Sequence, residues 1–270
     1  MPARTPSSPL DAPGYGPAVA DPHPLDPIDT AAPALTSPAI MGQRWADLVF
    51  LHWRVPVADV RPLVPRGCGV DTFDGSAWVG LIPFRLLDAG PGRLPGVPWL
   101  GSFVEWNVRT YTVDAEGRRG VAFCSLDAQR LGVVLGARAV FALPYMWAAM
   151  SGRRDGDVLH YRSRRLWPGP RGASSSTSVR LGPPVGEPDP LMLFLTARYG
   201  LHTRIGGRLV HVPNTHEPWP LHSAELLHLD DGLLAAAGLP GLADRAPDSV
   251  LASPGVRTHF GPPVPATGLP

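Results

Sequence analysis

Apolar and aromatic residues recur along the middle of the chain in short stretches separated by turn residues. Such stretches are typical of β-strands, whereas helices repeat their apolar positions every three to four residues. Residues 44–55 (RWADLVFLHWRV) predict a buried strand, and residues 57–64 fit a short helix that stops at Pro65. We predict further strands at residues 70–73, 76–87, 102–113, 120–128, 158–164, 179–181, 208–212 and 221–229. We predict further helices at residues 191–199 and 233–238, while residues 129–141 fit either a helix or a strand.

Two turn signals join these strands into hairpins. Asp74-Gly75 separates the second and third predicted strands, and Asp-Gly is a strong signal for a two-residue hairpin turn. The four residues 114–117 (DAEG) join the strands at 102–113 and 120–128. The strands are dense and the helices are too few and too short for parallel crossovers. The pattern therefore predicts a mainly β (α+β) fold, an antiparallel or mixed sheet closed into a barrel.

Proline marks the two ends of the chain. Ten prolines fall in residues 1–40 and seven in residues 240–270, against 17 in the residues between. Residues 1–40 also lack any sustained apolar period, so they cannot bury much surface. We predict a disordered tail at 1–40, a single β-barrel domain at 41–256, and a Pro-rich C-terminal tail at 257–270.

The predicted strand at 102–113 (SFVEWNVRTYTV) has one polar and one apolar face. Side chains alternate along a strand, so Phe103, Glu105, Asn107, Arg109 and Tyr111 share the polar face. This face is either solvated, as in a sandwich, or lines a polar barrel interior. Glu105 and Arg109 would lie roughly 13 Å apart at ~3.3 Å per residue. They would therefore not pair, but could contact opposite ends of one small ligand.

The next predicted strand (VAFCSLDA) has a similar pattern. If the hairpin pairs the two strands, Ser125 and Asp127 fall on the polar face beside Glu105 and Asn107. A serine and an aspartate near histidines raise the idea of a hydrolase triad. Ser125 has no GxSxG elbow around it, so a hydrogen-bonded barrel wall is the simpler interpretation.

Four histidines occur late in the chain, with Glu217 and Glu225 between them: His211, His216, His222 and His228. Their spacing is not that of a zinc-binding helix, and prolines interrupt the segment. We predict no metal, although a site built from separate strands stays open. His216, in the loop HEPWPL, is the histidine to test first, with a loop-anchoring hydrogen bond as its simpler role.

Arg138 introduces a charge into the most apolar window of the chain, residues 131–150. We interpret this window as buried core and not as a membrane span, because Arg138 and Pro144 interrupt it. A buried guanidinium needs partners. We expect the partner of Arg138 to be Glu105 or Asp127. Arg138 would then form a structural ion pair, or it would bind the carboxylate of a substrate.

Composition excludes several kinds of chemistry. All 24 basic residues are arginine, so no Schiff-base, pyridoxal-phosphate or phosphate-loop lysine exists. With 23 acidic residues the net charge is +1, which excludes a dedicated nucleic-acid binder and gives no sign of a membrane-surface partner. The two cysteines show no CxxC spacing, and we expect a cytoplasmic protein without disulfides. No cofactor is predicted, and a homo-oligomer stays open.

Seven segments together resemble the YqjF-like proteins, a bacterial family grouped with the acetoacetate decarboxylase-like superfamily. The similarity covers about residues 42–255. The segments are QRWADLVFLHW (43–53), DGSAWVGLIPF (74–84), FVEWNVRTY (103–111), FCSLDA (123–128), GARAVFALPY (136–145), LTARY (195–199) and HEPWPL (216–221).

This resemblance implies a cone-shaped, mostly antiparallel β-barrel with a closed pocket. In the decarboxylases the pocket holds two adjacent lysines, one of which forms a Schiff base with a β-keto acid. The similar segment here places Tyr145 and Met146 at those positions, so this chain lacks the imine-forming residue. The resemblance also places Glu105 on a pocket glutamate and Arg44 on an arginine that orients the substrate carboxylate.

Three hypotheses follow. The first is a lyase-like enzyme without a Schiff base, acting on a small carboxylated or carbonyl compound. The second is a non-catalytic small-molecule binding protein, and the third is a metal-dependent enzyme that uses His216. For the first we assign catalysis to Glu105, Tyr145 and Asp127, and ligand binding to Arg138, Arg109, Asn107, Ser125, Arg44 and His216.

Overall fold

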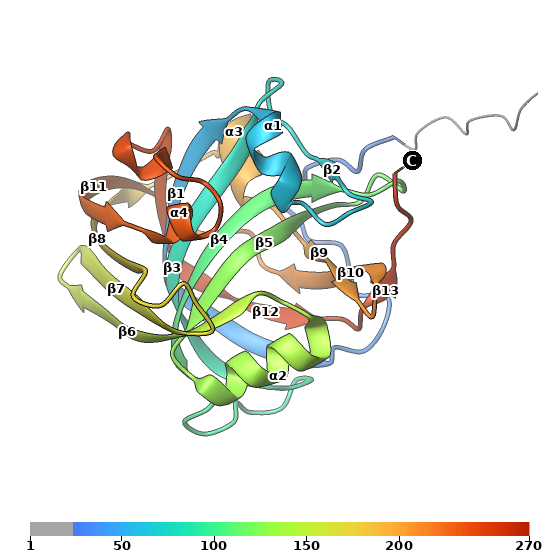
Figure 1. Ribbon diagram of the computed structural model, residues 1–270, viewed down its shortest axis with the longest axis horizontal. Helices are drawn as coiled ribbons and strands as arrows, with labels where there is room; N and C mark the ends of the chain where they lie inside the picture. The colour runs from blue at the N-terminus through green and yellow to red at the C-terminus, as the bar shows by residue number, and fades with distance from the viewer. Residues whose placement is uncertain (1–23, 270) are drawn as a thin grey trace, which may run out of the picture.

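A thirteen-stranded sheet dominates the computed structural model, which describes residues 24–269 (Figure 1). The strands are β1 (Met41–Val55), β2 (Gly69–Val70), β3 (Ala77–Pro91), β4 (Phe103–Val113), β5 (Arg119–Ala128), β6 (Tyr145–Asp155), β7 (Val158–Trp167), β8 (Ser174–Pro184), β9 (Gly200–Ile205), β10 (Arg208–His216), β11 (His222–Asp231), β12 (Ser249–Phe260) and β13 (Val264–Pro265). The helices are α1 (Val57–Val60), α2 (Leu131–Phe141), α3 (Pro190–Thr196) and α4 (Leu233–Ala236), with 3₁₀ turns at Arg61–Leu63 and Leu242–Asp244.

The sheet closes on itself in two places. β4 pairs with β5, which closes a ring that runs through β6, β7, β8, β11, β12, β1 and β3. β10 pairs with β12, and β9 with β5, which closes a smaller ring. The strand pairs are antiparallel except β5 with β6 and β5 with β9. The predicted class, a mainly β and mostly antiparallel fold with a few short helices, is confirmed.

Strands β1, β3 and β4 form a wall that both rings share. Their residues alternate between a packed core on one side and a cavity on the other, as the period of two requires. On β4, Trp106 is fully buried in the core, whereas Glu105 and Asn107 line the cavity. On β3, Leu81 packs into the same core and Ile82 lines the cavity. The predicted two-faced character of residues 102–113 is therefore correct.

The turn at Asp74-Gly75 has the geometry that its sequence indicates. Both residues have positive φ angles, 49° and 72°, as a type I′ turn requires. The strand predicted before it is shorter than expected, because β2 covers only Gly69–Val70 and Phe73 makes a single bridge to Ser76. The turn therefore caps the start of β3 and does not join two long strands.

A bulge in β5 changes which side chains face the cavity. Arg109 of β4 lies opposite Phe123, but Val108 lies opposite Ser125, so Cys124 is an extra residue in the ladder. One added residue reverses the alternation of the strand beyond it. Val121 and Phe123 line the cavity before the bulge and Leu126 lines it after the bulge. The prediction that Ser125 and Asp127 share the face of Glu105 is therefore wrong.

The apolar window 131–150 is not the buried core that its composition indicates. It contains helix α2, a turn and the start of β6. Only Val134 of α2 is buried, while Leu135 and Val140 are 50% and 59% exposed. Helix α2 lies at one end of the sheet (Figure 1), and Val133, Gly136, Ala137 and Phe141 of this helix line the cavity. Within residues 24–269, no helix is long and apolar enough to cross a membrane.

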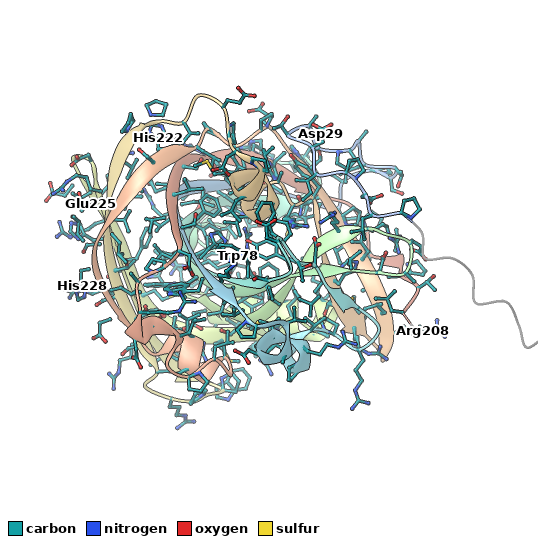
Figure 2. The ribbon with its side chains drawn as sticks, turned by 90° about the horizontal axis from the view of Figure 1, so that it is seen from above. Asp29, Trp78, Arg208, His222, Glu225 and His228 are labelled. Carbon is teal, nitrogen blue, oxygen red and sulfur yellow. The ribbon has the colours of Figure 1, made fainter. Side chains whose placement is uncertain are left out.

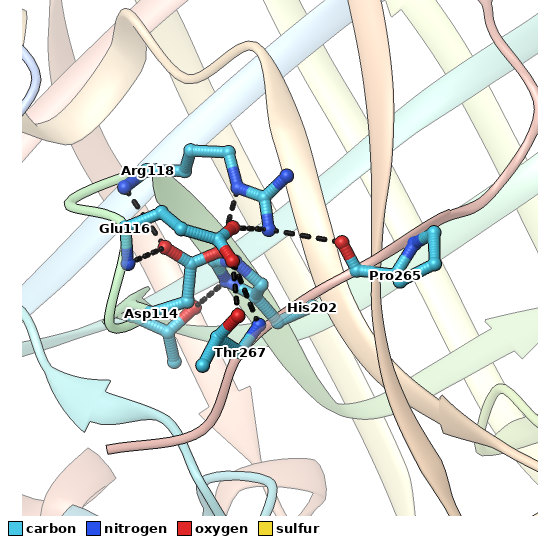
Figure 3. Close-up of polar contacts among 7 residues, drawn as sticks. Asp114, Glu116, Arg118, His202, Pro265 and Thr267 are labelled. Carbon is cyan, nitrogen blue, oxygen red and sulfur yellow. Dashed lines mark hydrogen bonds and ion pairs between the residues drawn. The ribbon is translucent and has the colours of Figure 1, made fainter.

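The predicted C-terminal tail is part of the sheet. The boundary at 257 falls inside β12, where Val256, Thr258 and Phe260 are buried at alternate positions, and β13 pairs with β10. Arg118 donates a hydrogen bond to the carbonyl of Pro265 at 3.1 Å (Figure 3). Proline content alone was misleading here, because an edge strand tolerates proline.

The described part of the predicted N-terminal tail contacts the domain. The Asp26 amide donates to the Gly117 carbonyl at 2.9 Å, and the Ile40 amide donates to the Phe260 carbonyl at 2.8 Å. Tyr199 donates its hydroxyl proton to the Thr30 carbonyl. Residues 24–40 are therefore attached to the sheet, whereas the prediction for 1–23 lies outside the described residues.

Candidate functional site

A cavity of about 330 Å³ lies inside the smaller ring of strands. Strands β1, β3, β4, β5, β9, β10 and β12 line its sides, with residues of α2 at one end and the residues around the end of α3 at the other. Twenty of the thirty lining residues are apolar, so the few polar groups are conspicuous. Mostly apolar cavities of this size with a few converging polar groups are typical small-molecule sites.

Glu105 and Tyr145 form the polar pair of the cavity nearer α2. The chain leaves α2 through Ala142, whose φ of 52° ends the helix, and β6 then starts beside β5 with Tyr145 opposite Leu126. This places the Tyr145 hydroxyl 2.9 Å from Oε2 of Glu105, to which it donates a hydrogen bond. Glu105 is 3% exposed.

Burial decides the charge of this pair. Loss of water raises the pKa of Glu105 from 4.5 to about 8, against the smaller, lowering effect of the Tyr145 hydrogen bond. The pKa of Tyr145 is raised well above 10 by burial and by the neighbouring carboxyl. At neutral pH both groups are therefore mostly uncharged, and Glu105 titrates in the range useful for acid and base chemistry.

Arg109 and Arg198 gather at the opposite end of the cavity. Their guanidinium carbons lie 5.7 Å and 4.8 Å from the centre of the Tyr111 ring. Arg109 Nη2 donates to the Leu195 carbonyl at 3.0 Å, and its buried Nε has no partner among residues 24–269. Arg198 follows α3, whose first turn is capped by the side chain of Asp189.

The two arginines differ in their counter-charge. Arg198 Nη1 lies 2.6 Å from a carboxylate oxygen of Asp71, while its Nη2 is buried and has no partner in the described residues. No carboxylate of residues 24–269 lies within 4 Å of Arg109. The cavity therefore carries one uncompensated positive charge at this end.

Two asparagines supply further polar atoms to the cavity. Asn107 lies between Glu105 and Arg109 on β4, and Asn214 lies on β10 across the ring. Each is buried, and each side-chain oxygen lacks a partner in the part of the chain that the structure describes. Unpaired buried amides are costly, which makes these groups available to a ligand or to water.

His216 is enclosed by aromatic rings beside the cavity. Its ring centre lies 4.9 Å from that of Trp219, 5.0 Å from Tyr199 and 6.0 Å from Trp45. Nδ1 lies 2.7 Å from the carbonyl oxygen of Glu217, which is the loop-anchoring contact considered above. Burial lowers the pKa of His216, so the ring is neutral.

The late histidines do not converge. His211 packs against His202, and His222 and His228 lie on β11 at the edge of the molecule with Glu225 (Figure 2). Within residues 24–269, no three His, Cys, Asp or Glu side chains are grouped so that they could hold a metal ion. The geometry of the described residues gives the metal hypothesis no support.

Asp127 and Ser125 belong to a separate buried ion pair. Asp127 Oδ1 accepts a hydrogen bond from Arg165 Nη2 at 2.6 Å, and both side chains are fully buried. Ser125 accepts from the same guanidinium at 3.2 Å. Neither residue lines the cavity, so neither lies where the predicted catalytic role of Asp127 and the predicted binding role of Ser125 would place it.

Arg138 and Arg44 also lie away from the cavity lining. Arg138 donates to the carbonyl of Tyr145 at 2.8 Å and lies over Trp167, not beside Glu105 or Asp127 as expected. Arg138 lies on the surface helix α2, where its side chain is partly exposed. Arg44 is exposed, because alternation along β1 turns Gln43 inward in its place. Neither arginine lies in the cavity lining, where its predicted binding role would place it.

Sequence reasoning missed four polar residues that line the cavity: Gln43, Thr196, Arg198 and Asn214. Arg198 lies in the LTARY segment and Gln43 begins the QRWADLVFLHW segment, so both lie in segments that carry the family resemblance. Asn214 comes from a segment with no comparable signal. Closure of the small ring, which no local pattern shows, brings it to the site.

Comparison with known proteins supports the same grouping. The family model DUF2071, described as an uncharacterized conserved protein, matches residues 42–257. A Bacillus subtilis protein named YqjF is 39% identical over 186 residues, which are 69% of this chain and 76% of that protein. The predicted relationship to YqjF-like proteins is therefore confirmed.

Two solved structures show the fold. An acetoacetate decarboxylase-like enzyme from Sphingomonas wittichii has a TM-score of 0.56 at 15% identity, covering 88% of this chain and 95% of its own. An acetoacetate decarboxylase has a TM-score of 0.58 at 12% identity, covering 88% and 92%. The chain therefore has an acetoacetate decarboxylase-like fold.

Proposed function

The chain belongs to the DUF2071 family, and we propose that it is a lysine-independent enzyme that moves a proton on a small carboxylated or carbonyl compound. One observation carries the proposal. Glu105 is buried in a ligand-sized cavity, with a pKa of about 8 and the Tyr145 hydroxyl fixed at 2.9 Å. A carboxyl tuned to this range is a stronger base than an ordinary glutamate and is still ionised in part near neutral pH.

The reaction follows from the groups present. The ionised Glu105 removes a proton from the carbon next to the ligand's carbonyl group, so a C–H bond breaks and an O–H bond forms. The electron pair moves to the carbonyl oxygen. The amide of Asn107 is the neighbouring donor that can stabilise that oxygen, while the hydroxyl of Tyr145 stays bonded to the Glu105 carboxyl. Returning the proton to carbon completes the exchange.

An imine route through a lysine is excluded by composition. The chain has no lysine, and Tyr145 occupies the position at which the resemblance places one. A phenol cannot form an imine. A neutral Tyr145 instead holds the Glu105 carboxyl in place, which suits proton transfer and not covalent catalysis.

The test is proton exchange in D₂O. The protein is incubated with 5-oxohexanoate or 7-oxooctanoate, whose ketones lie away from the carboxylate as Glu105 lies away from Arg109. Loss of the proton signals next to the ketone is followed by NMR, with carbon dioxide release measured in parallel. Exchange should rise with pH through about 8, because ionised Glu105 is the base. Glu105→Gln should abolish it. Tyr145→Phe should slow it about tenfold, as expected for one lost hydrogen bond to the Glu105 carboxyl.

The matched control is Glu225→Gln. Glu225 is an exposed glutamate on β11, paired with Arg180 and remote from the cavity lining. This variant should exchange at the wild-type rate. If wild-type protein binds an oxo acid but catalyses neither exchange nor carbon dioxide release, the protein is a small-molecule binding protein and the enzymatic proposal fails.

A further inference from the structure

We infer that the cavity takes a straight-chain carboxylate of about eight to ten carbons, with its carboxylate at Arg109 and Arg198 and its chain directed towards α2. The inference rests on the proposed function only in that both use this cavity. It names the substrate class and the direction of entry, and it predicts that short oxo acids are poor ligands.

Charge places the carboxylate. Arg109 is the cavity's uncompensated cation, and its buried Nε and the buried Nη2 of Arg198 both lack partners among residues 24–269. An unpaired guanidinium away from water is costly, and a carboxylate relieves that cost with charge-assisted hydrogen bonds. Glu105, mostly neutral and four residues away on β4, does not repel the anion.

The apolar walls define the rest of the ligand. Between the arginines and α2 the lining includes Val121, Phe123, Leu126, Ile82 and Phe84. A cavity of 330 Å³ holds about eleven groups of the size of a water molecule, at ~30 Å³ each. A saturated acid of eight to ten carbons has a matching number of non-hydrogen atoms. A three- or four-carbon oxo acid would leave roughly half of the apolar wall uncovered.

Exposure distinguishes the mouth from the closed end. At the arginine end, Arg198 is 5% and Thr196 is 3% exposed. At the other end, Gly136 of α2 is exposed and Ile40 is 40% exposed, and both line the cavity. The α2 end is therefore the mouth. A ligand that enters there places its carboxylate first and leaves the tail at the helix.

Gly136 is placed to limit the length of that tail. A Cβ atom built at this position meets no atom within 4 Å, so the space beside it is open. A leucine there would occupy the mouth without displacing a neighbour, and it would also favour the helix over glycine. This substitution should therefore shorten the preferred ligand and not unfold the protein.

The first experiment measures calorimetric affinities of the full chain for butanoate, hexanoate, octanoate, decanoate and dodecanoate. These saturated acids carry no ketone, so they have no activated C–H bond for Glu105 to deprotonate. Their binding is therefore independent of catalysis. Affinity should rise about fourfold per CH₂ up to eight to ten carbons and then level off or fall. Tightest binding by butanoate would overturn the inference.

The second experiment tests the position of the carboxylate. Octanoate and 1-octanol share a chain and differ in the head group, so wild-type protein should bind octanoate at least tenfold more tightly. Arg109→Met should remove that preference and retain octanol binding. The comparison of octanoate with 1-octanol on wild-type protein tests the position of the carboxylate even if Arg109→Met does not fold. Equal affinity for acid and alcohol would refute an arginine-bound carboxylate.

The third experiment uses a matched pair on α2. Gly136→Leu should lower the affinity for decanoate at least tenfold and change the affinity for hexanoate by less than twofold. Ala139→Leu, on the same helix but outside the cavity lining, should change neither. If Gly136→Leu leaves the length preference unchanged, the tail does not reach α2. The proposed enzymatic function fails separately, when a bound oxo acid shows no exchange.

Discussion

Glu105→Gln should make the protein more stable in alkaline solution, although it removes the group that we propose as the base. The substitution keeps the shape of the side chain and an oxygen that accepts from Tyr145. It removes only the ability to ionise. In the unfolded chain Glu105 titrates near its ordinary value of 4.5, and in the fold near 8.

The sign and size follow from this difference. Below pH 4.5 the carboxyl is protonated in both states, so it adds no pH-dependent term. Between pH 4.5 and 8 the unfolded chain loses its proton first, and wild type loses stability relative to the variant. Above pH 8 the difference in the free energy of unfolding between Glu105→Gln and wild type is constant. It is no more than about 5 kcal/mol for a pKa raised to about 8. Water entering the cavity reduces it, so we expect about 2–5 kcal/mol.

Urea unfolding of wild type, Glu105→Gln and the surface control Glu225→Gln at pH 5, 7 and 9 measures the gap. At pH 5 the first two should agree within about 1 kcal/mol, and at pH 9 Glu105→Gln should be more stable. Glu225 is 65% exposed, so its variant should follow wild type at each pH. A Glu105→Gln protein that is less stable than wild type at pH 9 would show an ionised, paired Glu105 and would remove the basis of the proposed chemistry.

Three further outcomes test the architecture. Asp127→Asn should destabilise the fold by about 3–5 kcal/mol in urea unfolding, since it breaks the fully buried pair with Arg165, and octanoate affinity should stay unchanged. Gly255→Ala should lower the melting temperature by several degrees, because its Cβ would lie 1.8 Å from a carbonyl oxygen of β1 and its φ is 116°. Deleting residues 1–23 should leave the melting temperature within about 2 °C of wild type. Deleting 24–40 as well should lower it, because the carbonyls of Gly117 and Phe260 then lose the amides of Asp26 and Ile40.

The polar face of β4 could be predicted because it depends only on local geometry. Alternation along one unbroken strand places Glu105, Asn107 and Arg109 together whatever the rest of the chain does. The hairpin to β5 was equally predictable from its turn. The positions of Ser125 and Asp127 could not be predicted. A single bulge reverses the alternation, and no residue in VAFCSLDA indicates that a bulge forms there.

The remaining errors concern long-range closure and register. Arg44 and Gln43 are neighbours, so an alignment displaced by one residue exchanges the exposed side chain for the one in the cavity. Arg198 and Asn214 reach the site only because β9 and β10 close the small ring against β5 and β12. Hydrophobic patterns describe which face of an element is buried. They do not describe which distant strand it meets.

Replacing a lysine by tyrosine beside Glu105 changes more than one functional group. An ammonium within hydrogen-bonding distance would favour the ionised carboxylate and lower the pKa of Glu105. A neutral phenol gives much less support, so burial dominates and the pKa of Glu105 rises to about 8. The same substitution thus removes the imine-forming amine and creates a carboxyl that exchanges protons near neutral pH. In the proposed function, Arg109 supplies the charge that binds an acid, and the chemistry is proton transfer in place of carbon–nitrogen bond formation.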